Sequence, residues 1–117
     1  MRFLSIFKTV ETGVPPTADE MARMGQFMDE MAKAGKLLAT EGLLPSAKGV
    51  RVRKVGQQVT VTNGPFTASP EVISAYAILQ ADSKQEAIEL TKQFLQVAGD
   101  GECEIRELYE MPAFVRK

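Results

Sequence analysis

Acid–base chemistry in this 117-residue chain would have to use carboxylates or a phenol, because the sequence contains no His and a single Cys. The lack of His excludes Ser-His-Asp and Cys-His catalysis and any His metal ligand within one chain. Among the acids, Glu41 is the best candidate for a catalytic base. Its neighbours Ala39, Gly42 and Leu43 could bury it partly, as acid–base work at neutral pH requires. The alternative is an exposed strand residue, or an ion pair with an arginine of the hairpin that follows.

Two arginines, Arg51 and Arg53, are candidate ligand-binding residues. They are two positions apart, so they share one face of a regular strand. Two guanidinium groups on one face could hold a carboxylate or a phosphate. A solvent-facing hairpin with Val50 and Val52 directed inward explains the two arginines equally well.

The phrase Asn63-Gly64-Pro65-Phe66 has both a structural and a functional interpretation. Asn-Gly is a favoured turn pair, and Pro65 restricts the backbone. In a ligand site, Phe66 would supply an apolar wall and Asn63 a pair of hydrogen-bonding groups. Tyr76 likewise fits a core position with a satisfied hydroxyl, or a proton donor in the same site.

The remaining chemistry-bearing residues do not form a motif. Cys103 alternates with Ile105 and is predicted to be a small core residue. A single Cys excludes an intrachain disulfide and a Cys-clustered zinc site. The glycines of residues 99–101 follow a helix rather than a strand, so they match no nucleotide-binding loop. We therefore predict neither a metal nor a cofactor.

Composition places the chain among soluble globular proteins, as one domain over residues 1–117. It is 44% hydrophobic and 25% charged, and its formal net charge is −1. A general nucleic-acid binder is usually basic, so this class is disfavoured. No apolar run is long enough to span a membrane, and Lys8 interrupts the apolar N-terminal stretch. With one thiol and no export signal, the expected location is the cytoplasm.

Charge is uneven along the chain. Residues 1–58 carry a net charge of +3 and residues 59–117 a net charge of −4. No acid occurs between Glu41 and Glu71, whereas four cations do: Lys48, Arg51, Arg53 and Lys54. This segment is either a charged hairpin edge that resists aggregation or an attractive field for an anionic ligand.

Hydrophobic periodicity and capping signals predict two strand–helix–strand units with a hairpin between them. Thr17 with Glu20, and Ser83 with Glu86, form capping-box patterns at the two helix starts, and Gly35 is placed to end the first helix. Met21, Met24, Phe27, Met28 and Met31 give that helix a stripe typical of core packing. The predicted strands cover residues 2–8, 36–44, 48–55, 58–63, 71–80 and 102–110. The fold class is therefore α+β, a ferredoxin-like split βαβ with an inserted hairpin and an antiparallel sheet.

The strands are apolar on both faces, although two helices can cover only one face of the sheet. A second copy of the chain is the simplest cover for the other face. We therefore predict a homodimer whose sheets pack face to face.

Several phrases resemble the YCII-related family, also called the DGPF-domain family. They are the strand Phe3–Phe7 and the segments 41–46, 62–66 and 76–83, the last leading into Glu86 and Ala87. The resemblance implies a dimeric α/β barrel and small-molecule binding or catalysis in a cleft beside the sheet. A His–Asp pair suggested for smaller relatives cannot apply here, because the chain has no His. Asn63 also stands where the family motif has Asp, and Asn cannot serve as a base.

Two functions stay open at this point. The first is a cytoplasmic homodimer that binds a small anionic or aromatic molecule, with Glu41 as its only plausible base. Its predicted ligand-binding residues are Asn63, Pro65, Phe66, Tyr76, Arg51 and Arg53. The alternative is a non-catalytic dimeric adaptor or regulatory protein. The residues do not decide whether the chain is an enzyme.

Overall fold

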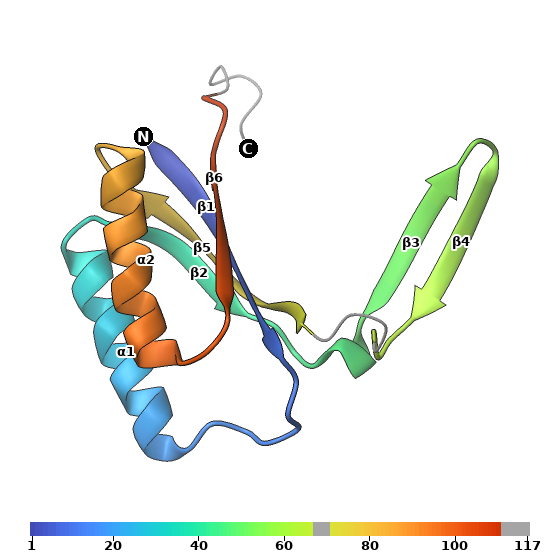
Figure 1. Cartoon of the computed structure of the whole chain (residues 1–117), viewed down its shortest axis with the longest axis horizontal. Coiled ribbons are helices and arrows are strands. Elements are labelled where there is room, and N and C mark those ends of the chain that lie inside the picture. Colours follow the sequence, from blue (N-terminus) through green and yellow to red (C-terminus); the bar gives the residue numbers. More distant parts are fainter. Residues whose placement is uncertain (67–70, 111–117) are drawn as a thin grey trace.

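The computed structural model describes residues 1–66 and 71–110 of the chain (Figure 1). Its elements follow the predicted order: β1 (Arg2–Val10), α1 (Ala18–Lys33), β2 (Leu37–Gly42), the 3-10 helix η1 (Ser46–Lys48), β3 (Val50–Val55), β4 (Gln58–Asn63), β5 (Glu71–Gln80), α2 (Lys84–Ala98) and β6 (Glu102–Glu107). Neither helix of the described chain has the length and apolar character needed to cross a membrane.

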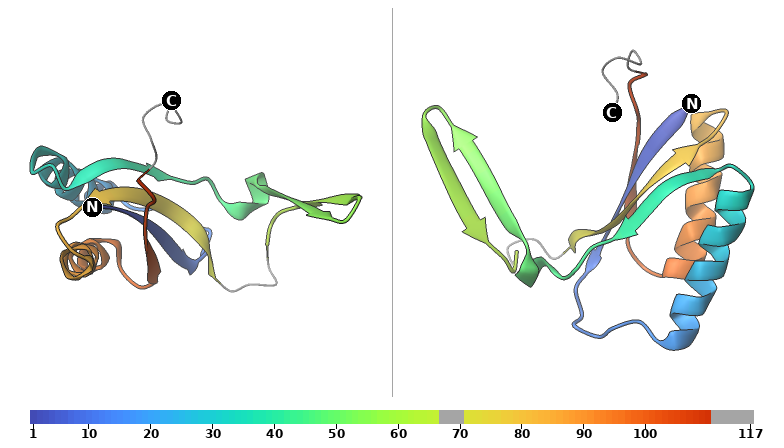
Figure 2. Two further views of the ribbon diagram at one scale, coloured as in Figure 1. Left: turned by 90° about the horizontal axis from the view of Figure 1, so that it is seen from above. Right: turned by 180° about the vertical axis from the view of Figure 1, so that it is seen from behind.

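Four strands form one antiparallel sheet in the order β2-β5-β1-β6. The first strand of each βαβ unit, β1 or β5, lies in the middle of the sheet, and the second, β2 or β6, lies at an edge. This interleaving is the split βαβ arrangement, so the predicted ferredoxin-like α+β fold is confirmed. Both helices lie against the same face of the sheet (Figures 1 and 2).

The core lies between this face and α2. Phe3 is 1% exposed and packs in a cluster with Leu79, Ala81, Ala87 and Leu90. Helix α1 contributes no buried residue to this core. Its stripe faces the sheet only in part: Met24, Phe27, Met28 and Met31 are half-buried, and Met21 is 57% exposed. The prediction of core packing for the stripe is therefore only partly right.

The first predicted helix cap is confirmed and the second is half right. Thr17 accepts the Glu20 amide at 3.1 Å, and Glu20 accepts the Thr17 amide at 2.9 Å, which completes the capping box. Ser83 accepts the Glu86 amide in the same way. The Glu86 carboxylate, however, accepts from Lys36 at 3.0 Å and from the Asp82 amide at 3.2 Å. The capping box predicted that the Glu86 carboxylate accepts the Ser83 amide. The Lys36 cation is a stronger hydrogen-bond partner for this carboxylate than that amide.

Removing the first cap should cost stability. We expect Thr17→Ala to lower the free energy of unfolding by about 1 kcal/mol, because an amide of the first turn of α1 loses its acceptor. Urea unfolding measures the loss. Thr17→Ser keeps the hydroxyl and should stay close to wild type; equal losses in both variants would contradict this role of the hydroxyl.

The hairpin of β3 and β4 forms its own two-stranded sheet. It extends away from the four-stranded sheet (Figure 1), with the turn at Gly56, whose φ is 59°. An inward orientation of Val50 and Val52, which belonged to one of the two alternatives for this hairpin, is not found within one chain. Their exposed fractions are 52% and 66%, because no other element of the described chain covers the hairpin.

Candidate functional site

A cleft of about 550 Å³ lies at the base of the hairpin, where η1 meets the beginning of β5. Apolar groups form much of its wall: Leu43, Leu44, Pro45, Val72 and Ile73. Ser46, Lys48 and Arg51 supply polar and cationic groups, and Phe66 supplies an aromatic ring. No described lining residue is acidic. The cleft therefore combines apolar walls with positive charge.

Arg51 and Phe66 are in direct contact in this cleft. The guanidinium carbon of Arg51 lies 3.9 Å from the centroid of the Phe66 ring, which is cation–π stacking. A stacked guanidinium keeps its N–H donors in the plane of the group, where they can bind a carboxylate edge-on. Within the described residues no carboxylate pairs with Arg51.

A buried serine holds the cleft wall together. Ser46 donates its hydroxyl to Glu11 Oε1 at 2.5 Å and its amide to Glu11 Oε2 at 2.6 Å. The Ser46 Oγ atom also accepts the Phe66 amide at 3.2 Å. These hydrogen bonds hold the pKa of Glu11 below its usual value, the serine hydroxyl contributing most. One hydroxyl thus connects the segment after β1, the start of η1 and the aromatic residue of the cleft.

The sequence reasoning missed both Glu11 and Ser46. Ser46 belongs to a phrase that matches the family, but nothing in that phrase shows a partner 35 residues earlier in the chain. The only local signal for Glu11 was its position as a single acid in a loop that contains Gly and Pro.

The residues after β4 approach η1 closely. Gly64 donates its amide to the Gly49 carbonyl at 3.0 Å, and the Gly64-Pro65 peptide bond is cis. A Cβ atom on Gly64 would lie 1.7 Å from the Ser46 carbonyl oxygen. Asn63 ends the hairpin opposite Val50. Asn63, Gly64 and Pro65 therefore fit the role of turn residues rather than ligand-binding residues. Of the phrase 63–66, only Phe66 lines the cleft.

Glu41 and Tyr76 lie elsewhere. They face one another on β2 and β5, and by register both are on the sheet face that the helices leave uncovered. Glu41 is exposed, as in the alternative of an exposed strand residue, and the partial burial that a catalytic base would need is not found. It lies at the end of an edge strand, where only one strand neighbours it. The adjacent Gly42 lines the cleft, but Glu41 does not.

Arg53 is also outside the cleft, since it lies two residues farther along β3 on the face of the hairpin that carries Arg51. The structure thus brings Arg51 together with Phe66, and Glu41 together with Tyr76, in two separate places.

Cys103 does not have the surroundings of a nucleophile. It is half-buried on β6, and burial raises the pKa of its thiol, with Ser5 acting in the opposite direction. In the described ranges, no group of three metal-ligating side chains lies close enough to hold a metal ion.

Comparison with known proteins agrees with this fold. The model of the YCII-related domain matches residues 1–112, so the chain belongs to the YCII-related family. A solved structure with a similar fold is the 5-chloro-2-hydroxyhydroquinone dehydrochlorinase TftG from Burkholderia phenoliruptrix AC1100, in complex with 2,5-dihydroxybenzoquinone. The TM-score is 0.58 at 14% sequence identity, over 95% of this chain and 96% of that one. No curated protein sequence matches the chain.

Proposed function

We propose that this protein binds a small, anionic, aromatic molecule in the cleft at the base of the hairpin. The observation that carries the proposal is the stacking of Arg51 on Phe66, beside Lys48, in a cleft whose described lining holds no acid. The cations would attract and hold the anionic group, and the apolar walls would contact the ring.

The dimensions of the cleft fit this class of ligand. Small-molecule sites usually enclose about 300–1,000 Å³ and combine apolar walls with a few oriented polar groups. The cleft, at about 550 Å³, falls in that range. The dihydroxyquinone bound to TftG is not aromatic, but it shares the planar ring and the acidic oxygens of the proposed ligands, which makes it a suitable first probe.

We further propose that the protein acts as a cytoplasmic homodimer. The single Cys fits a reducing compartment. The sheet face without helices offers a surface for a second copy. Acid–base chemistry by Glu41 or Tyr76 stays a prediction outside the binding proposal, because neither side chain is placed beside the Arg51 and Phe66 pair.

Two arginines on one face of the hairpin provide the test. We expect Arg51→Met to weaken binding of 2,5-dihydroxybenzoquinone at least about tenfold, because the ligand loses its bidentate donor. Arg53→Met removes the same charge from a position outside the cleft and should change the affinity less than about twofold. Isothermal titration calorimetry measures both.

Equal losses in the two variants would mean that only general charge attracts the ligand. If neither the quinone nor benzoate binds the wild-type protein, the proposed ligand class is wrong.

A further inference from the structure

A second cavity lies between the two helices and the four-stranded sheet, and we call it the helix–sheet cavity. Its volume is about 50 Å³, and β1, β2, β5 and both helices contribute to its lining. Three phenylalanines and two methionines belong to this lining: Phe7, Phe27, Phe94, Met28 and Met31. The described linings of this cavity and of the cleft at the base of the hairpin share no residue. Binding in the two places can therefore be tested separately.

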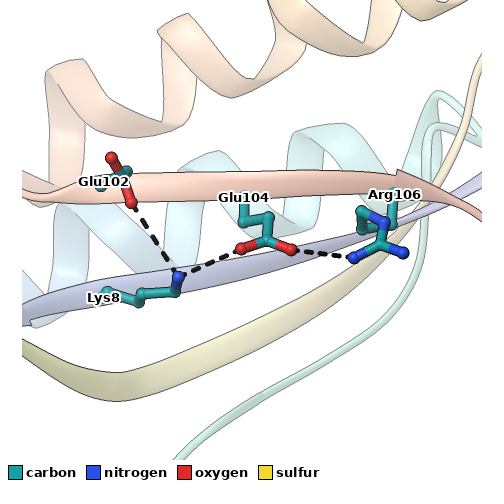
Figure 3. A network of polar contacts seen from close by, with 4 residues as sticks. All are labelled: Lys8, Glu102, Glu104 and Arg106. Carbon is teal, nitrogen blue, oxygen red and sulfur yellow. Dashed lines mark hydrogen bonds and ion pairs between the residues drawn. The ribbon is translucent and has the colours of Figure 1, made fainter.

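No charged residue lines the helix–sheet cavity within the described chain. The charged groups of β1 and β6 form a network in which Lys8 lies 3.1 Å from Glu104 and 3.9 Å from Glu102, and Arg106 lies 3.1 Å from Glu104 (Figure 3). Alternation along the strands places this network on the opposite face of the sheet from Phe7. An ionic ligand would therefore find no counter-charge in the cavity, and burying its charge there would be unfavourable.

The hydroxyl groups of the lining already have partners within the protein. Thr40 and Thr91 each donate to a backbone carbonyl at 2.8 Å, and Ser5 forms a hydrogen bond with the side chain of Cys103. Over the part of the chain that the structure describes, no buried side-chain nitrogen or oxygen lacks a hydrogen-bond partner. The cavity thus offers a polar ligand no unpaired group, so an apolar ligand fits it better.

The wall that α1 forms is the one that can yield to a ligand. Helix α1 contributes no buried residue, and its Phe27, Met28 and Met31 side chains are half-buried. The opposite walls include Leu79 and Leu90, which are only 7% and 9% exposed. Methionine side chains are flexible and polarizable, so they adapt to the shape of an occupant. A ligand can therefore enter past α1 with a smaller loss of buried area than at any of the leucine walls.

An aromatic pair favours a ring as the occupant. Phe7 and Phe94 meet edge to face, with ring centroids 5.2 Å apart and an angle of 85° between the planes. A third ring beside them would gain aromatic contacts in addition to the burial of its area. The cavity at rest is smaller than the apolar cavity of about 150 Å³ that is known to bind benzene. A ring of that size must therefore displace the methionine side chains of α1.

We infer that the helix–sheet cavity is a second binding site, which takes a small uncharged aromatic molecule of about the size of benzene. The ligand lies between the methionines of α1 and the pair of Phe7 and Phe94. This site differs from the cleft in the charge of its ligand, because the cleft presents cations and the cavity presents none.

The methionines of α1 provide a direct test in the wild-type protein. Carbon-13 labelling of the methionine methyl groups allows Met28 and Met31, which line the cavity, to be followed separately from Met21, which is 57% exposed. Benzene should shift the signals of Met28 and Met31 and leave that of Met21 unchanged. Benzoate has the same ring with a negative charge, and it should shift none of the three because the cavity does not accept an unpaired charge.

Two variants of α1 form a matched pair. Met28 and Met24 are both half-buried and lie one helical turn apart, but only Met28 lines the cavity. Met28→Trp fills the cavity and should raise the dissociation constant of benzene at least about tenfold, whereas Met24→Trp should change it less than about twofold. The shift of the Met31 methyl signal measures the affinity in both variants, and circular dichroism checks their folding. If Met28→Trp does not fold, the titration of the wild-type protein decides.

Several results would show that the cavity is a packing void rather than a binding site. They are a wild-type protein in which benzene shifts no methionine signal, a shift of Met21 as large as that of Met28, and equal losses of affinity in the two Trp variants. If benzoate shifts Met28 and Met31 as benzene does, the assigned ligand class is wrong. Arg51→Met should lose quinone binding and keep benzene binding; loss of both would contradict two separate sites.

Discussion

Replacing Gly64 by Ala should collapse the cleft and strongly destabilise the protein. The new Cβ would lie 1.7 Å from the Ser46 carbonyl oxygen and 2.7 Å from its carbonyl carbon. Both obstacles are backbone atoms, so no side-chain rotation can relieve the overlap. Either η1 or the segment after β4 must move, and the Gly64 hydrogen bond to Gly49 lies between them. We expect the free energy of unfolding to fall by about 3 kcal/mol or more, which is the upper end for overpacking. Quinone binding should be lost.

Gly42 is the matched control for this substitution. It is also a cleft-lining glycine, but a Cβ there meets no atom within 4 Å, and its φ is not positive. Gly42→Ala should therefore unfold at the wild-type denaturant concentration or slightly above it. Urea unfolding of both variants decides the matter, and a Gly64→Ala protein as stable as Gly42→Ala would show that the two segments separate without cost.

The secondary structure could be predicted from the sequence because its signals are local. The Thr17 and Glu20 pattern lies within one helical turn, and the strand at residues 71–80 is found with the same bounds in the structure. Ser83 shows where such reasoning ends. The hydrogen bond from the Glu86 amide to Ser83 is local and was predicted correctly. The Glu86 carboxylate, however, binds Lys36, which is 50 residues away in the sequence.

The cleft was predictable only in part for the same reason. Alternation along β3 separates Arg51 from Val52, and this division is found in the structure. Alternation cannot tell what covers either side, so it left open whether Val52 is directed inward, and within one chain Val52 is exposed. The contact of Arg51 with Phe66 and the approach of Glu11 to Ser46 both depend on how distant segments meet at the base of the hairpin.

The Glu11 and Ser46 pair should make part of the stability depend on pH. Hydrogen bonds from Ser46 lower the pKa of Glu11 in the folded protein from its ordinary value of 4.5. The ionised carboxylate therefore stabilises the folded state fully above that ordinary value. This contribution is lost as the pH falls through the lowered pKa, where the folded state also takes up the proton. We expect the stability of Glu11→Gln to change less than that of wild type between about pH 7 and about pH 3.

A control for charge is Glu107→Gln, which removes one negative charge from an exposed position of β6 far from Ser46 in the sequence. It should keep the wild-type dependence on pH. If the dependence of stability on pH weakened equally in both variants, the effect would come from net charge rather than from the Glu11 and Ser46 pair.

Ser46→Ala tests the other half of the pair. It leaves the partly buried amide of Phe66 without its acceptor, and we expect a loss of about 1 kcal/mol at neutral pH, measured by urea unfolding. Ser74→Ala, where the hydroxyl makes one longer hydrogen bond of 3.3 Å to Val72, should cost less. If the pair acts as a unit, combining Ser46→Ala with Glu11→Gln should cost little more than Ser46→Ala alone. Additive losses would mean that Glu11 stabilises the fold without holding Ser46, and the cleft wall would then depend on the approach of Gly64 alone.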